Sequence, residues 1–142
     1  MDNTFYNEIL IDHNLHPLHK ETLPKANLVL EGVNPSCGDD LVLQFRVEND
    51  IIEEAAFAGS GCAISQASAD IMVDMVIGRH KDEALHLADL FTRMIHGKAT
   101  EDEIEELEEA GALKDIAHMP SRVKCAILSW HTMEEVLQKD PQ

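Results

Sequence analysis

Apolar and polar residues alternate between residues 28 and 58, and this period of two is typical of strands. A short apolar run opens the region, an alternating stretch follows it, and a turn at 48–50 leads into a third stretch. The predicted strands cover residues 28–30, 41–47 and 51–58. In the last of them Ile51, Ala55 and Phe57 share one face with Glu53, so the alternation is imperfect. Strands joined by short turns predict an antiparallel meander.

Helical spacing of apolar residues precedes and follows this region. An amphipathic helix is predicted over 3–14, and it ends before Pro17 because the residue preceding a proline avoids helical angles. Further helices are predicted after Gly61 and over 81–96, the second with Gly97 as its cap. A third runs from a capping box at 100–103 to a stop at Gly111. The last starts near Ser121, with Pro120 before the cap. Strands first and helices after predict a single α+β domain over 1–142, a three-stranded antiparallel sheet with helices packed on it.

The net negative charge of the chain limits the classes of molecule that it is expected to bind. The formal net charge of -16 argues against nucleic acid and against an anionic membrane surface, because both need clustered lysine and arginine. No run of about 18 apolar residues exists to span a bilayer. The first residues lack the basic start and apolar stretch of a signal peptide, which makes the cytoplasm the expected compartment.

The 3 cysteines carry the candidate chemistry. An odd number in a reducing compartment argues against a disulfide framework. Cys37 and Cys62 lie at glycine-bearing turns, and Cys125 follows a predicted helix start, where a thiolate is stabilised and metals bind. Gly38 permits a sharp turn between Cys37 and Asp39, so both side chains can face one point. The set predicts a centre of thiolates with Asp39 as a fourth ligand.

Other interpretations stand beside this one. Cysteine often acts as a small buried apolar residue, and Asp39 can simply cap a turn or a strand. Paired Cys-x-x-Cys knuckles are absent, so the spacing alone is a weak signal for zinc. Among the 8 histidines, the group at positions 13, 16 and 19 is expected at the solvated surface. His131 is expected to point away from Cys125, whereas His118 can approach through its loop.

Three motifs in this order resemble the IscU/NifU-N family of iron–sulfur cluster assembly proteins, with most similarity to its SufU branch. They are Asn-Pro-Ser-Cys-Gly-Asp at 34–39, Gly-Ser-Gly-Cys-Ala-Ile-Ser at 59–65, and Lys124-Cys125. The scaffold branch has a histidine where Lys124 stands, and it lacks the acidic segment at about 98–113. Its Leu-Pro-Pro-Val-Lys stretch, read by an Hsp70-type chaperone, is replaced here by residues 119–124, so the resemblance does not carry over chaperone recognition.

The resemblance implies a metal site at one exposed end of a small antiparallel sheet. Cys37, Asp39, Cys62 and Cys125 match the metal ligands of the family. In the SufU-like branch the metal is Zn2+, and the partner is a SufS-like cysteine desulfurase, a PLP enzyme that loads sulfur on its own cysteine. Cys37 matches the residue that takes this sulfur, for delivery to a downstream cluster-assembly complex.

The leading hypothesis is therefore a zinc-dependent sulfur acceptor of the sulfurtransferase type, with Cys37 as the catalytic nucleophile. The first alternative is a scaffold that binds iron and assembles a transient [2Fe–2S] cluster on the same four residues. A second alternative, from another class, is a binding module whose zinc is structural and whose sulfurs are inert.

Overall fold

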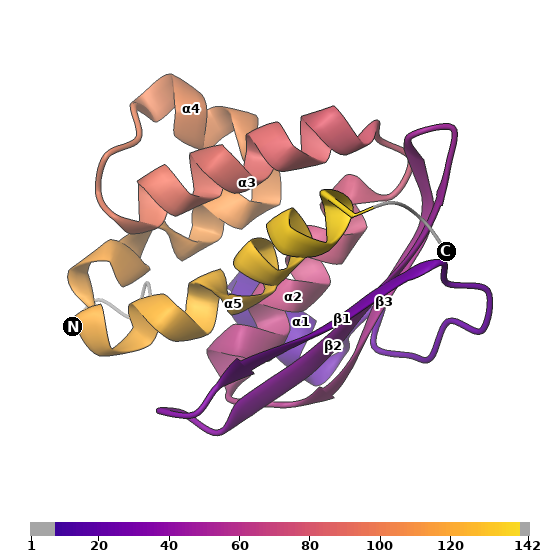
Figure 1. The fold of residues 1–142 in the computed structure, drawn as a ribbon. Helices are drawn as coiled ribbons and strands as arrows, with labels where there is room; N and C mark the ends of the chain where they lie inside the picture. The colour runs from indigo at the N-terminus through magenta and orange to yellow at the C-terminus, as the bar shows by residue number, and fades with distance from the viewer. Residues whose placement is uncertain (1–7, 140–142) are drawn as a thin grey trace.

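The strands form one antiparallel sheet, as the alternating pattern predicts (Figure 1). The computed structural model describes residues 8–139. β1 (Leu28–Asn34), β2 (Asp39–Glu48) and β3 (Ile51–Ser60) lie in the order β1-β2-β3, with both neighbouring pairs antiparallel. Residues 41, 43, 45 and 47 of β2 point into the core, because alternate residues of a strand face the same side. The α+β class and the three-stranded antiparallel sheet are confirmed.

Helices cover one side of this sheet in two layers (Figure 1). They are α1 (Glu8–Leu15), α2 (Ala63–Val76), α3 (Lys81–Ile95), α4 (Glu101–Glu106), the 3₁₀ helix η2 (Glu108–His118) and α5 (Pro120–Leu137). α2 and α5 contact the sheet and each other, while α3 packs on α5 and η2 packs on α3. Positions 3–7 of the predicted N-terminal helix lie outside the described residues. None of the helices within 8–139 has the length and apolar character needed to cross a bilayer.

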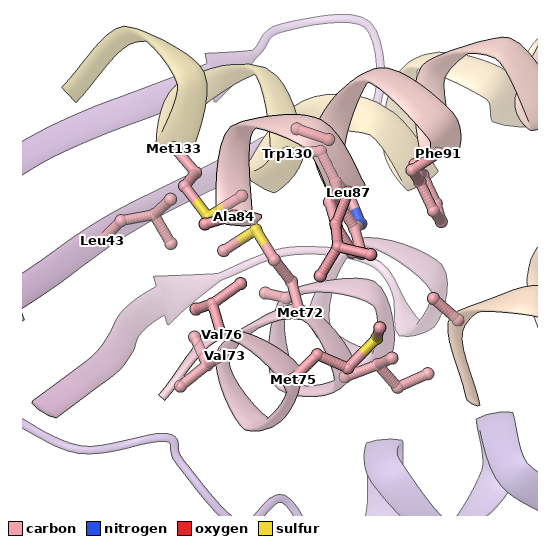
Figure 2. Packing of buried hydrophobic residues seen from close by; sticks show 14 of the residues in the cluster. Leu43, Met72, Val73, Met75, Val76, Ala84, Leu87, Phe91, Trp130 and Met133 are labelled. Atoms are coloured by element: carbon pink, nitrogen blue, oxygen red, sulfur yellow. The ribbon is translucent and has the colours of Figure 1, made fainter. Parts of the chain in front are cut away.

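The core between these layers is mainly aliphatic and includes aromatic rings and methionines (Figure 2). Trp130 of α5 stacks on Phe91 of α3, with ring centroids 4.3 Å apart and an interplanar angle of 9°. The Trp130 indole N–H donates to the Ser68 hydroxyl at 3.0 Å, so its polar atom is satisfied inside the core. Met72 of α2 and Met133 of α5 are fully buried in this core, where an unbranched side chain fills irregular gaps.

A β-bulge explains the imperfect alternation of the third strand. Arg46 pairs with Glu54 and Val47 pairs with Ile52, so Glu53 is an extra residue in β3. The extra residue shifts the alternation by one position, and Ile52 rather than Ile51 points into the core. The prediction that Ile51 shares the face of Ala55 and Phe57 is therefore wrong.

The predicted stop of the acidic helix at Gly111 is also wrong. α4 ends at Glu106, and the chain continues through Gly111 as the 3₁₀ helix η2. The buried apolar residues here recur every third position, which matches the three residues per turn of a 3₁₀ helix. They are Leu107, Ala110, Leu113 and Ile116.

α5 begins slightly earlier than the sequence predicts. Pro120 is its first helical residue and Met119 is the cap, whereas Ser121 was expected to open the helix. Proline suits the first helical position, because the N–H that it lacks has no partner inside the helix there.

His13 lies in the interior, against the prediction of a solvated cluster. It is 5% exposed and its Nδ1 is 2.5 Å from the Asp70 carboxylate of α2. Its Nε2 contacts the Glu109 carboxylate of η2. Asp70 also accepts the backbone N–H groups of Leu18 and His19, so this carboxylate holds α1 and the following loop onto α2.

Candidate metal centre

The loop between β1 and β2 positions Cys37. Asn34 and Asp39 are paired across the two strands, and residues 35–38 make the turn between them. The Cys37 N–H donates to the Asn34 carbonyl at 3.2 Å. Gly38 has a φ of 71°, a left-handed conformation that glycine adopts without strain. A Cβ at Gly38 would contact nothing within 4 Å, so this glycine is needed for its backbone angle and not for space.

Cys62 is the N-cap of α2, as the sequence predicts. Its backbone is extended, with φ −72° and ψ 168°, and its sulfur accepts the Ser65 N–H at 3.5 Å. The helix dipole favours negative charge at this end, so the position suits a thiolate. The side chain is half-buried.

The Asp39 carboxylate links the sheet to the start of α2. It is fully buried, and its Oδ1 accepts the Cys62 N–H at 2.8 Å and the Ser65 hydroxyl at 3.1 Å. A Cβ at Gly61 would lie 2.8 Å from this Oδ1 and 2.4 Å from the Ser65 hydroxyl oxygen. The carboxylate therefore occupies the space that a side chain at Gly61 would fill.

Cys125 completes the group from α5. It is fully buried, and its Sγ lies 3.0 Å from the Cys37 Sγ. Burial raises the pKa of the Cys125 thiol, and its hydrogen bonds to Cys37 and Cys62 and the nearby charges of Cys62 and Asp39 raise it further. Without a cation, negative charge at this thiol is disfavoured by burial and by its anionic neighbours.

Three of the four predicted residues converge, although they come from distant parts of the sequence. Ligand atoms of Cys37, Asp39 and Cys125 all lie within 4.8 Å of one another. The Cys62 sulfur is not among these atoms; it accepts the Ser65 N–H at 3.5 Å at the start of α2. The structure thus shows a possible metal site of cysteine and aspartate, and ligation by all four residues stays a prediction.

The donor set fits a soft divalent cation. Thiolate and carboxylate are ligands that zinc accepts in a tetrahedron, and iron accepts the same thiolates. A buried carboxylate needs a compensating charge, yet within residues 8–139 no lysine, arginine or histidine forms an ion pair with Asp39. Its hydrogen-bond donors are neutral groups, so a bound cation would supply the missing positive charge.

Two histidines considered from the sequence take no part in this group. His118 ends η2 with an exposed side chain, and His131 is exposed on α5 beside Glu134. Two contributors were missed, Asn34 and Ser65. Asn34 opens the motif at 34–39 but is not a usual metal-ligand type, and Ser65 stands three residues after Cys62, a spacing typical of a helix cap and its partner.

Comparison with known proteins identifies the family of this chain. A family model described as the NifU-like N terminal domain matches residues 5–126. The chain belongs to this family. The resemblance stated from the motifs is thereby confirmed, and the chain is an iron–sulfur cluster assembly protein of the IscU/SufU kind.

Individual relatives cover nearly all of the chain. The zinc-dependent sulfurtransferase SufU of Bacillus subtilis is 36% identical, over 97% of this chain and 92% of its own length. The iron–sulfur cluster assembly scaffold protein IscU of Streptococcus pyogenes serotype M1 is 40% identical, over 96% of this chain and 85% of its own. The similar identities do not decide between the two activities.

A solved structure confirms the fold. An iron–sulfur cluster assembly protein described as a scaffold for the SUF system of Fervidobacterium islandicum AW-1 superposes with a TM-score of 0.88 at 36% identity, covering 96% of this chain and 99% of that one. A NifU-like N-terminal domain from Brucella abortus, at 18% identity and a TM-score of 0.85, shows the likeness of fold alone.

Proposed function

We propose that this protein is a zinc-dependent sulfur acceptor in iron–sulfur cluster assembly. The observation that carries the proposal is the contact between Cys37, half-buried on a glycine turn, and a fully buried thiol and carboxylate. The name of the Bacillus relative, a zinc-dependent sulfurtransferase, supports the same activity.

Cys37, Asp39, Cys62 and Cys125 would hold the zinc ion. When bound, zinc keeps the thiols deprotonated at neutral pH and offsets the repulsion among these anionic groups. Cys62 and Cys125 are fixed by the helices α2 and α5, whereas Cys37 stands on a loop. The loop cysteine is the one that can move without disturbing the core.

Cys37 is the sulfur acceptor in this proposal. The partner is a cysteine desulfurase that carries the sulfur as a persulfide on its own cysteine. The Cys37 thiolate attacks the terminal sulfur, which keeps its proton; the persulfide S–S bond breaks, a new S–S bond forms on Cys37, and the desulfurase cysteine leaves as a thiolate. Oxidation states balance, because one persulfide replaces another. A downstream cluster-assembly complex then takes the sulfur from Cys37.

The rate of alanine release by the desulfurase tests this role. Wild-type protein should stimulate repeated turnover, because each transfer frees the desulfurase cysteine, and Cys37→Ala should not. Ser36→Ala is the matched control, since it changes an exposed neighbour on the same loop and leaves the nucleophile in place. Full stimulation by Cys37→Ala would rule the role out.

A scaffold for a [2Fe–2S] cluster is the second candidate. Three thiolates with one harder carboxylate would hold such a cluster loosely, which suits its transfer, and several relatives are named scaffold proteins. Anaerobic reconstitution with iron and sulfide distinguishes the two by visible absorption. A stable, stoichiometric cluster that passes to an apo-acceptor would favour the scaffold.

A structural zinc site is the third candidate, and alkylation of the zinc-loaded protein tests it. If zinc only ties the sheet to the helices, all three sulfurs should resist the reagent. Reaction at Cys37, the half-buried thiol of the loop, would exclude a purely structural site.

A further inference from the structure

A buried amide side chain lies at the base of the loop that carries Cys37. Asn34 is the last residue of β1 and is 6% exposed. Its pairing with Asp39 places it where the two strands meet the turn. A buried primary amide needs hydrogen-bond partners, and those of Asn34 belong to the candidate metal centre.

Asn34 contacts each of the three residues whose ligand atoms converge. Its carbonyl oxygen accepts the Cys37 N–H at 3.2 Å. Its side-chain Nδ2 lies 3.4 Å from the Asp39 Oδ2 and 3.9 Å from the Cys125 Sγ, within hydrogen-bonding range for oxygen and sulfur acceptors. One residue of β1 therefore joins a loop, a strand and a helix at the site.

We propose that Asn34 is a positioning residue that orients the Asp39 carboxylate and the Cys125 sulfur toward a shared metal ion. The proposal deepens the proposed function and rests on it. Outer-shell donors fix the orientation of ligands and alter their basicity, and their loss weakens metal binding. Asn34 supplies such a donor to two ligands from one amide group.

The contacts on Asp39 are divided between its two oxygens. The Cys62 N–H and the Ser65 hydroxyl both donate to Oδ1, on the side of α2. Asn34 donates to Oδ2, on the side of β1. Donors on both oxygens fix the plane of the carboxylate, so its orientation toward a metal depends on the Asn34 amide as well as on the helix.

The same amide makes the cysteines unequal. An N–H donor on a thiolate draws charge from the sulfur and makes it less nucleophilic. The Asn34 side chain lies near the buried Cys125 sulfur. Asn34 contacts Cys37 through its backbone carbonyl instead, which accepts the Cys37 N–H. Cys125 is thereby the fixed anchor of the site, and Cys37 keeps the more reactive sulfur.

The strand provides a matched control. Asn27, which precedes β1, also clamps the strand through its side chain, with its Nδ2 donating to the Val47 carbonyl and its Oδ1 accepting the Val47 N–H, each at 2.9 Å. Asn27→Ala removes an asparagine side chain that also binds the neighbouring strand, at the opposite end of β1 from the site. Asn34→Ala and Asn34→Leu remove the amide, the second with its bulk largely kept.

Zinc affinity by chelator competition and the absorption spectrum of the Co2+-substituted protein are the readouts, with urea unfolding of the metal-free form as a measure of structure. Both Asn34 variants should lose about tenfold or more in zinc affinity and should shift the thiolate-to-cobalt absorption bands. Asn27→Ala should lower the stability of the metal-free form while leaving zinc affinity and the cobalt spectrum unchanged.

NMR of the wild-type protein gives a second test that needs no variant. The side-chain amide resonances of Asn34 should shift on zinc addition, and those of Asn27 should not. Unchanged resonances at Asn34, or zinc affinities of both Asn34 variants equal to wild type, would overturn the assignment. If the wild-type chain takes up no zinc at all, the proposed function fails first, so the two failures are distinguishable.

Discussion

Replacing His13 by leucine should destabilise the protein by stranding a buried charge. His13 lies between the fully buried Asp70 carboxylate and the Glu109 carboxylate. Leucine keeps much of the bulk and suits helix α1, but it removes both ring nitrogens. The cost therefore comes from the electrostatics of Asp70 and not from a cavity.

The loss of stability in His13→Leu depends on the hydrogen bonds that Asp70 keeps in the variant. Removing one partner of a buried ion pair typically costs about 3–5 kcal/mol. Asp70 keeps the backbone N–H donors of Leu18 at 3.1 Å and His19 at 2.8 Å, so the lower end, about 3 kcal/mol, is expected. The Glu109 side chain is 44% exposed, so Glu109→Gln should cost no more than about 1 kcal/mol.

The stabilisation should depend on pH with a definite sign. Burial lowers the pKa of His13, but hydrogen bonds to Asp70 and Glu109 and the charges of both carboxylates outweigh it and raise the pKa above its ordinary value. A group with a raised pKa in the folded state stabilises fully below the unfolded value of about 6.5. The stabilisation is lost as the pH rises through the raised pKa.

Urea unfolding of wild type and His13→Leu across this range measures the difference in free energy of unfolding. The gap should be widest on the acid side and should narrow toward alkaline pH. His19→Leu is the control, since that imidazole pairs at 2.9 Å with Asp74, whose side chain is 49% exposed. Equal losses for the two variants, or a gap independent of pH, would refute the role of Asp70 and His13.

Three further predictions concern the metal centre. Asp39→Ala should release zinc faster to a chelator, because one ligand is lost; unchanged retention would remove Asp39 from the ligand set. Gly61→Ala should lower stability by about 1–3 kcal/mol and weaken zinc binding, since its Cβ would lie 2.8 Å from the Asp39 Oδ1; wild-type values in unfolding and metal titration would contradict this. In thermal unfolding of the zinc-loaded protein, Cys62→Ser and Cys125→Ser should lower the Tm more than Cys37→Ser, because zinc ties their helices to the sheet; equal shifts would be evidence against unequal roles.

Much of the fold could be predicted because its core follows the two ordinary periods. β2 alternates as a half-buried strand does, and α2 and α3 repeat apolar residues at helical spacing. The bulge at Glu53 is harder to read, since one inserted residue changes the phase of alternation within a strand. The 3₁₀ helix was missed because apolar residues every third position, from Leu107 to Ile116, also fit a helical pattern with a glycine stop.

At the site, features set by neighbouring residues could be predicted, whereas contacts between residues far apart in the sequence could not. Cys37 and Cys62 were recognisable because their glycine turn and helix cap are local features. His13 was wrongly predicted at the surface because its partners Asp70 and Glu109 lie 57 and 96 residues away in the sequence. The residues next to His13 give no sign of these partners. Asn34 was missed because one of its two amide partners, Cys125, is 91 residues distant, although the other, Asp39, is 5 residues away.

The buried carboxylates Asp39 and Asp70 differ in the groups that can balance their charge. Both are fully buried, and both accept backbone N–H groups. Asp70 faces the His13 imidazole, which can carry the compensating positive charge. The charge of Asp70 is therefore balanced within the protein, and the pair contributes to stability. Asp39 has thiols, a hydroxyl and amides around it, and no cationic side chain between residues 8 and 139 pairs with it. A cation bound at Asp39 would supply the compensating charge that His13 can supply to Asp70. This difference supports the proposed metal site at Asp39 and leaves Asp70 a role in holding α1.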